Sequence, residues 1–265
     1  GGGGGRDERG GVGGARGGGG GGTERPYPIW GEPLSRVCAR EGVTVPHVVS
    51  RAIAFLTERH LDEEGLLRLS GSRADMDELV AKFEAGAPID FAGQDAHTVA
   101  GLLKSYLREL PTPLVGPRHN RLAAEVIARE QPEMQTALEL KDIIITLPDC
   151  EYHTTKALVR FLSDVVAHSD KNRMHKDNVL TVMVPTLQCV PALFSNAIDC
   201  YELFFDESFN GRAAYVAKQR AAAAAAAARR RQKTALLRLL HLALHPPCVR
   251  SKWATATTQP HRRGR

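Results

Sequence analysis

Residues 97–114, HTVAGLLKSYLRELPTPL, carry the clearest helical pattern in this chain. Its apolar side chains recur every three or four positions, as at Val99, Leu103 and Leu110, which predicts a helix with one buried face. Asp95 stands where a helix N-cap is expected. Pro111 ends the helix because proline offers no backbone N–H. The stretch therefore predicts a long amphipathic helix in the interior of a folded domain.

The same spacing of apolar residues continues on both sides of this stretch. The one strand-like run, Ile143 to Ile145, is too short and isolated to build a sheet. We therefore predict an all-α fold, an irregular helical bundle. The predicted helices span residues 46–60, 72–86, 95–110, 118–130, 132–146, 152–168, 176–184 and 195–205.

The two ends of the chain differ in composition from its middle. Residues 1–25 are mostly glycine, and we expect this segment to be disordered because it has little apolar surface to bury. Residues 28–210 are long enough for one sizeable core and form the predicted domain. Residues 211–265 hold an alanine run and an arginine-rich tail, which we expect to be low-complexity and partly helical or disordered.

Charge and cysteine content exclude several classes of protein. The net charge is +5, but residues 26–210 carry 18 Lys and Arg against 27 Asp and Glu, a net of −9. An acidic folded region does not favour nucleic acid as a partner. The five cysteines form no CxxC pair, so we expect reduced thiols, a cytoplasmic location and no metal site. No glycine-rich phosphate loop follows a strand, so we expect the chain to bind no nucleotide itself.

Four segments, in order, resemble the RhoGAP family of Rho GTPase-activating proteins. They are IWGEPL at 29–34, GLLRLSGS at 65–72, the opening stretch at 97–114, and NRM at 172–174 followed by NV at 178–179 and PTL at 185–187. The resemblance covers about 160 residues. It implies a RhoGAP-type helical bundle that stimulates GTP hydrolysis by a Rho-family small GTPase. Such an activator is not itself an enzyme, because it acts in trans on the active site of the GTPase.

The resemblance assigns Arg68 as the catalytic arginine finger. GTP hydrolysis moves negative charge onto the γ-phosphoryl group, and an arginine presents a planar, permanently charged fork of donors to it. Taken alone, an arginine between leucines is more often a surface or capping residue. We expect Gly65, Ser70 and Gly71 to support the loop, with the glycines allowing its turns. We also expect the loop to be anchored in the core by its three leucines, Leu66, Leu67 and Leu69.

Three further residues are predicted GTPase contacts. Lys104 and Arg108 lie four apart on one helix face, and the matching family positions touch the GTPase or support the finger loop. On spacing alone, a solvated basic pair is the more common explanation, and the family match is what favours contact with the GTPase. Thr186 occupies a position where many family members have Asn, and threonine keeps one donor and one acceptor. Asn178 and Pro111 are expected to support the site structurally.

The implied partner is a Rho-family GTPase in its GTP-bound form, to which the GTP and Mg²⁺ belong. We therefore expect no cofactor in this chain. Two alternatives remain open: a scaffold that binds the GTPase without accelerating it, and a helical module directed to lipid by the basic tail. The run Ala221 to Ala228 followed by Arg229, Arg230 and Arg231 could form a helix that rests on an anionic membrane, or a weakly ordered segment. The sequence does not determine which GTPase is the target.

Overall fold

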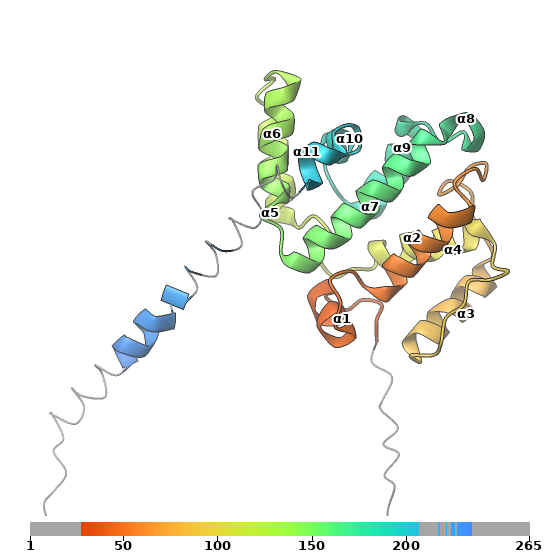
Figure 1. Ribbon diagram of the computed structural model, residues 1–265, viewed down its shortest axis with the longest axis horizontal. Coiled ribbons are helices and arrows are strands. Elements are labelled where there is room, and N and C mark those ends of the chain that lie inside the picture. Colours follow the sequence, from red (N-terminus) through yellow and green to blue (C-terminus); the bar gives the residue numbers. More distant parts are fainter. Residues whose placement is uncertain (1–27, 207–216, 218–220, 222–223, 226, 235–265) are drawn as a thin grey trace, which may run out of the picture.

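The computed structural model describes residues 28–206, and in the tail residues 217, 221, 224, 225 and 227–234. Residues 28–206 form a bundle of helices (Figure 1), and no strand occurs among the described residues. The predicted all-α class is therefore confirmed. The helices are α1 (Leu34–Glu41), α2 (His47–Arg59), α3 (Arg73–Glu84), α4 (Ala96–Arg108), α5 (Pro117–Ile127), α6 (Glu133–Ile144), α7 (Asp149–Ala167), α8 (Ser169–Asn172), α9 (Lys176–Leu187), α10 (Pro191–Asp199) and α11 (Tyr201–Phe205).

The helices begin at the residues that favour helix starts. Asp95 caps α4, since its carboxylate accepts the backbone N–H of Thr98 at 2.8 Å. Ser72 caps α3, since its hydroxyl accepts the N–H of Asp75 at 3.3 Å. Each cap satisfies a backbone donor that has no partner inside the helix.

Several helices differ from the predicted ones. The short helix α8 was not predicted, and α7 and α10 begin three and four residues before the predicted starts at 152 and 195. The short helix α1 was not predicted at all. The predicted helix 195–205 is two helices, because the backbone at Cys200 (φ −120°, ψ 42°) leaves the helical region between α10 and α11. Helix α9 continues past the predicted end at residue 184, with Pro185 inside its last turn. There, the missing proline N–H forfeits one hydrogen bond at the end of the helix.

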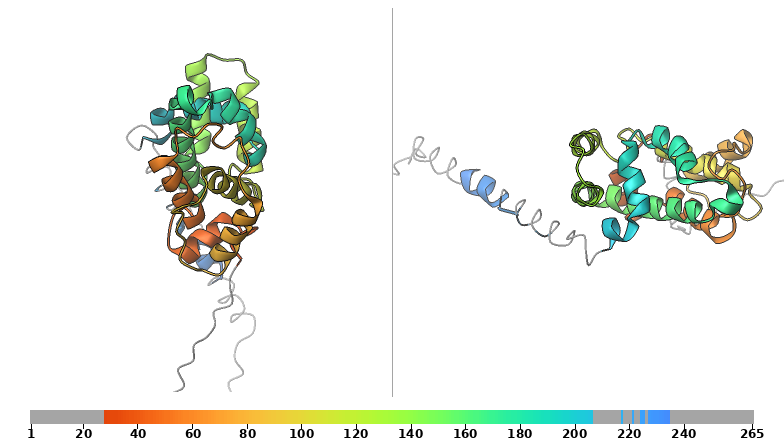
Figure 2. Two further views of the ribbon diagram at one scale, coloured as in Figure 1. Left: turned by 90° about the vertical axis from the view of Figure 1, so that its right-hand side faces the viewer. Right: turned by 90° about the horizontal axis from the view of Figure 1, so that it is seen from above.

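Helix α7, the longest at 19 residues, runs through the middle of the bundle and packs against α1, α2, α9, α10 and α11. Helices α2 and α4 pack on each other, and α4 also contacts α3 and α9. The α5–α6 pair and α3 lie toward opposite ends of the bundle (Figure 2). At the start of the domain, Trp30 packs its ring edge-on against Tyr106 at 5.4 Å between centroids. These contacts fix α4, which carries much of the site, from both sides.

The ends of the chain are described only in part. The Gly-rich segment 1–25 and residues 207–210 lie outside the described residues. In the tail, the described residues are helical and exposed, including the continuous stretch 227–234. Within the described part of the chain, no helix has both the length and the apolarity needed to cross a bilayer.

Candidate functional site

The loop between α2 and α3, residues 60–72, presents Arg68 to solvent and is called the finger loop below. Arg68 is exposed, whereas the preceding Leu66 and Leu67 are completely buried. The backbone N–H groups of Arg68 and Leu69 both donate to the carbonyl of Gly65, at 2.8 and 2.9 Å. Within the described residues, the Arg68 side chain forms no ion pair. The loop thus holds its backbone in a tight turn and leaves the guanidinium outside.

The prediction that Leu69 anchors the finger loop in the core is wrong. Leu69 is 46% exposed, so it does not join the core. It bends back over Gly65 instead, where an added Cβ would lie 2.7 Å from the Leu69 Cγ. Because Gly65 also has a φ of +69°, a side chain here would be both strained and crowded. Leu69 therefore adds an apolar side chain to the exposed surface next to Arg68.

Lys104, on α4, holds the middle of the finger loop. Its Nζ donates a hydrogen bond to the backbone carbonyl of Leu67. Leu67 has a φ of +71°, which is unfavourable for a residue with a side chain, so the loop needs such outside support. Burial, and after it the nearby charge of Arg108, lowers the pKa of Lys104. No carboxylate is paired with Lys104 among the described residues, so its amine acts chiefly on the loop backbone.

The start of α4 holds the end of the finger loop. The Ser72 N–H donates to the Thr98 hydroxyl at 2.9 Å, and that hydroxyl donates to the Asp95 carboxylate at 3.1 Å. Gly71 passes so close to α4 that an added Cβ would lie 2.2 Å from the Thr98 backbone nitrogen. Only glycine fits at this crossing. The predicted supporting role of Gly71 thus has a steric reason, although Ser70 itself is exposed.

Asn172, at the end of α8, holds the beginning of the finger loop, a role that the sequence did not suggest. Its backbone carbonyl accepts the N–H of Gly65 at 2.8 Å. Its buried side chain donates to the carbonyls of Leu61 and Val165, both at 2.8 Å, and accepts the N–H of Met174 at 2.7 Å. Asn172 therefore ties the loop to α7. The one sign of its importance in the sequence was its position at the start of NRM, residues 172–174, in the fourth segment that resembles the RhoGAP family.

The other predicted site residues lie in different surroundings. Arg108 is exposed and forms no ion pair among the described residues. Pro111 is exposed just after α4. Asn178 is exposed and donates to the backbone carbonyl of Arg173 at 3.1 Å. Thr186 is only 6% exposed, and its hydroxyl donates to the carbonyl of Val182 within α9 at 3.1 Å. This geometry does not support a direct contact of the Thr186 hydroxyl with a partner.

Known proteins resemble this chain over most of its helical domain. A family model described as the RhoGAP domain matches residues 46–192. The chain belongs to the RhoGAP family. The match covers the whole arrangement, from α2 through the finger loop and α4 to the start of α10.

Several relatives of this RhoGAP chain are named as Rho GTPase-activating proteins. Rho GTPase-activating protein gacT of Dictyostelium discoideum is 30% identical over 68% of this chain and 18% of its own length. Rho GTPase-activating protein 27 of Rattus norvegicus is 33% identical over 60% of this chain and 18% of its own. The chain thus spans about a fifth of these relatives. The crystal structure of human Rho GTPase activating protein 15 is 28% identical, covers 68% of this chain and 93% of its own, and has a TM-score of 0.65.

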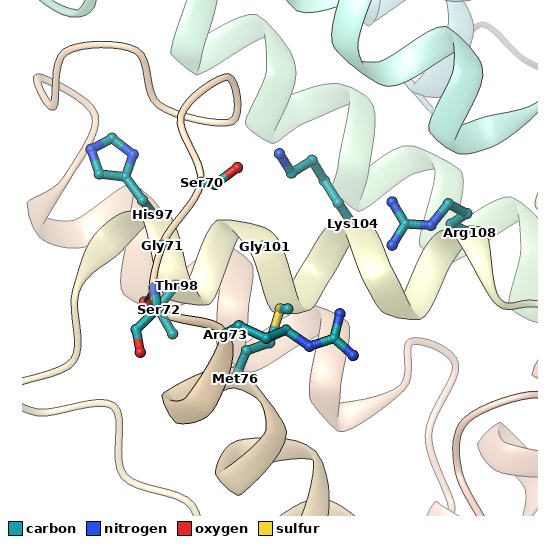
Figure 3. A pocket seen from close by; sticks show the side chains of 10 residues that line it. All are labelled: Ser70, Gly71, Ser72, Arg73, Met76, His97, Thr98, Gly101, Lys104 and Arg108. Atoms are coloured by element: carbon teal, nitrogen blue, oxygen red, sulfur yellow. Dashed lines mark hydrogen bonds between the residues drawn. The ribbon is translucent and has the colours of Figure 1, made fainter.

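A pocket of about 330 Å³ lies between the finger loop, α3 and α4 of this RhoGAP domain (Figure 3). Three of its side chains, Arg73, Lys104 and Arg108, are basic, and none is acidic. Among the described residues, no group of three His, Cys, Asp or Glu could hold a metal ion. The pocket is lined by Ser70, Gly71, Ser72, Arg73, Met76, His97, Thr98, Gly101, Lys104 and Arg108.

Proposed function

We propose that this RhoGAP domain stimulates GTP hydrolysis by a Rho-family small GTPase, into whose active site it inserts Arg68. One observation carries the proposal: Arg68 is exposed on a loop whose preceding residues, Leu66 and Leu67, are completely buried. An arginine on a mobile loop would lose conformational entropy when it enters the GTPase active site. The backbone that carries Arg68 is already fixed by its buried leucines, so less entropy is lost.

The chemistry explains what Arg68 contributes. In the transition state, negative charge spreads over the transferred γ-phosphoryl group and the leaving oxygen. A guanidinium stabilises that charge with two parallel donors and cannot lose its own charge. An arginine finger of this kind contributes on the order of 10³–10⁵ in kcat. The nucleotide, Mg²⁺ and attacking water belong to the GTPase, so the domain is an activator in trans with no cofactor of its own.

The surrounding contacts support a rigid finger. Lys104 bonds the loop at Leu67, Asn172 bonds it at Gly65, and Thr98 bonds it at Ser72. The three contacts come from α4 and from the end of α8, so the backbone on both sides of Arg68 is held. Such pre-organisation is what a single positioned charge needs, because a misplacement of about 1 Å costs on the order of 100-fold in rate.

Single-turnover hydrolysis by a panel of GTP-loaded Rho-family GTPases tests the proposal. We expect the wild-type chain to accelerate at least one of them. Arg68→Ala should lose at least about 100-fold of the acceleration, and Arg68→Lys most of it, because lysine lacks the planar fork. Arg36→Ala is the matched control, an exposed arginine on α1 whose one ion pair within the described part of the chain is with Glu32, at 3.2 Å.

Binding to the same GTPases, loaded with a non-hydrolysable GTP analogue, separates the proposal from its rival. Arg68→Ala should still bind if Arg68 acts mainly in the transition state. Tight binding by the wild type without acceleration would identify a scaffold and refute the proposed activity. Equal acceleration by the wild type and Arg68→Ala would refute the arginine finger.

A further inference from the structure

The pocket beside the finger loop concentrates positive charge in an otherwise acidic domain. Residues 26–210 have a net charge of −9, yet Arg73, Lys104 and Arg108 line one pocket without an acidic residue. Figure 3 shows Arg73 coming from the start of α3, while Lys104 and Arg108 leave successive turns of α4. Like charges gathered in one hollow repel one another, so the arrangement favours an anionic occupant.

The charges of the pocket are only weakly neutralised within the domain. Lys104 bonds a neutral backbone carbonyl, and Arg108 forms no ion pair among the described residues. Arg73 pairs with Asp77, one turn along α3, at 3.0 Å. That pair is weak, because the two side chains are 79% and 59% exposed. Most of the positive potential of the pocket is therefore available to a partner.

The N-terminal turn of α3 adds to this potential. Ser72 and Arg73 begin the 12-residue helix and line the pocket, and the Ser72 hydroxyl accepts the N–H of Asp75. The backbone N–H groups before Asp75, in the first turn of α3, have no hydrogen-bond partner inside the helix. The helix dipole also places partial positive charge at this end of α3. His97 also lines the pocket, with its Nε2 3.7 Å from the carboxylate of Glu63 in the finger loop.

We propose that this pocket receives an aspartate or glutamate side chain of the GTPase and that Arg73 determines which GTPases fit. The inference rests on the proposed function. Ser70 and Gly71, which line the pocket, follow Arg68 by only two and three residues. A protein whose nucleotide reaches Arg68 therefore also covers the pocket. A volume of about 330 Å³ admits a carboxylate side chain together with water.

Arg73→Gln and Arg73→Glu test the assignment through the concentration of this protein that gives half-maximal acceleration. With a GTPase that the wild type activates, we expect this concentration to rise several-fold for Arg73→Gln and on the order of 10-fold or more for Arg73→Glu. The maximal rate should stay near that of the wild type, because the proposal gives Arg73 a role in binding and leaves the transition state to Arg68. Arg36→Glu is the matched control, since Arg36 is similarly exposed (72%) and also pairs with a carboxylate four residues away.

Met76→Trp tests whether the GTPase carboxylate enters the pocket or is only attracted by its charge at long range. Met76 lines the pocket, and tryptophan narrows it without changing any charge. We expect the half-maximal concentration to rise again. Thermal unfolding checks that the variant folds, and Met76→Phe replaces it if it does not.

The possible results separate this inference from the proposed function. If Arg73→Glu behaves like Arg36→Glu, Arg73 is not a determinant and the inference is wrong, whatever Arg68 does. If Arg73→Glu weakens activation but the Met76 variant does not, the charge acts only at long range and the pocket is not occupied. If the wild type activates no GTPase, the proposed function has failed first, and the inference fails with it.

Discussion

At the scale of single residues, Gly71 is constrained by space and not by its backbone angles. Gly71→Ala would place a Cβ 2.2 Å from the Thr98 backbone nitrogen, so the finger loop or α4 must move. We expect the free energy of unfolding to fall by about 1–3 kcal/mol and the acceleration of hydrolysis to fall with it. Urea unfolding measures the first. Gly101→Ala, inside α4, is the control, since its Cβ would approach only the end of the flexible Met76 side chain, at 3.3 Å. Equal losses in both variants would contradict the steric explanation.

The buried amine of Lys104 should make the stability of the domain depend on pH. Burial lowers the pKa of Lys104 in the folded domain below its ordinary value of 10.5. Between these two pKa values the unfolded chain binds more protons than the folded domain, so the unfolding free energy rises with pH. Below the pKa of Lys104 in the folded domain, the amine is charged in both the folded and the unfolded chain, so the unfolding free energy no longer changes with pH through this group.

Comparison of the wild type with Lys104→Met isolates this effect. We expect the unfolding free energy of the wild type, relative to Lys104→Met, to increase as the pH rises from neutral to 10.5. Urea titrations at several pH values measure the difference. A difference that does not change with pH would mean that the Lys104 amine is solvated as in the unfolded chain.

At the scale of elements, the start of α4 is coupled to the finger loop. Asp95→Ala removes the cap on the Thr98 N–H and should cost about 1 kcal/mol of stability. It also removes the acceptor that orients the Thr98 hydroxyl toward Ser72. Hydrogen exchange should therefore speed up at the Ser72 amide.

Asp90→Ala is the control for this coupling. Among the described residues, the Asp90 carboxylate accepts a single hydrogen bond, from the N–H of Ala92 at 2.8 Å, within an exposed loop. Its loss should leave Ser72 exchange unchanged. Unchanged exchange in Asp95→Ala as well would show that the cap stabilises α4 alone.

Sequence patterns predicted the elements to different degrees. Helix α4 was predictable because its apolar spacing and its cap agree. Helix α1 was missed because it has only eight residues, too few for a clear apolar pattern. Its buried residues Leu34, Val37 and Cys38 lie in the core because α1 packs against α7. The single predicted helix 195–205 was divided at Cys200, where the apolar pattern continues although the backbone does not.

At the scale of the whole molecule, Asn172 joins the finger loop to the central helix. Asn172→Ala would remove the side-chain hydrogen bonds to the carbonyls of Leu61 and Val165 and to the N–H of Met174. The Val165 carbonyl would keep the N–H of His168 at 3.2 Å, so the losses that matter most are those at Leu61 and Met174. We expect a loss of more than about 2 kcal/mol, because buried unsatisfied groups cost about 1–3 kcal/mol each. Asn178→Ala, which removes one exposed hydrogen bond, should cost much less. Thermal and urea unfolding compare the two, and similar losses would contradict the connecting role of Asn172.

Sequence patterns were enough to predict the helical class and most of the helices, because apolar periodicity and helix caps act over a few residues. The assignment of Arg68 as the finger came from the resemblance to the RhoGAP family and stays a prediction. Only the tertiary structure decided that Asn172 holds the loop and that Lys104 bonds the Leu67 carbonyl. It also decided that Thr186 turns inward while Leu69 stays outside. The Lys104 contact joins residues 37 positions apart, and the Asn172 contact joins residues still further apart in the chain. Local sequence patterns do not encode which helix faces meet over such separations.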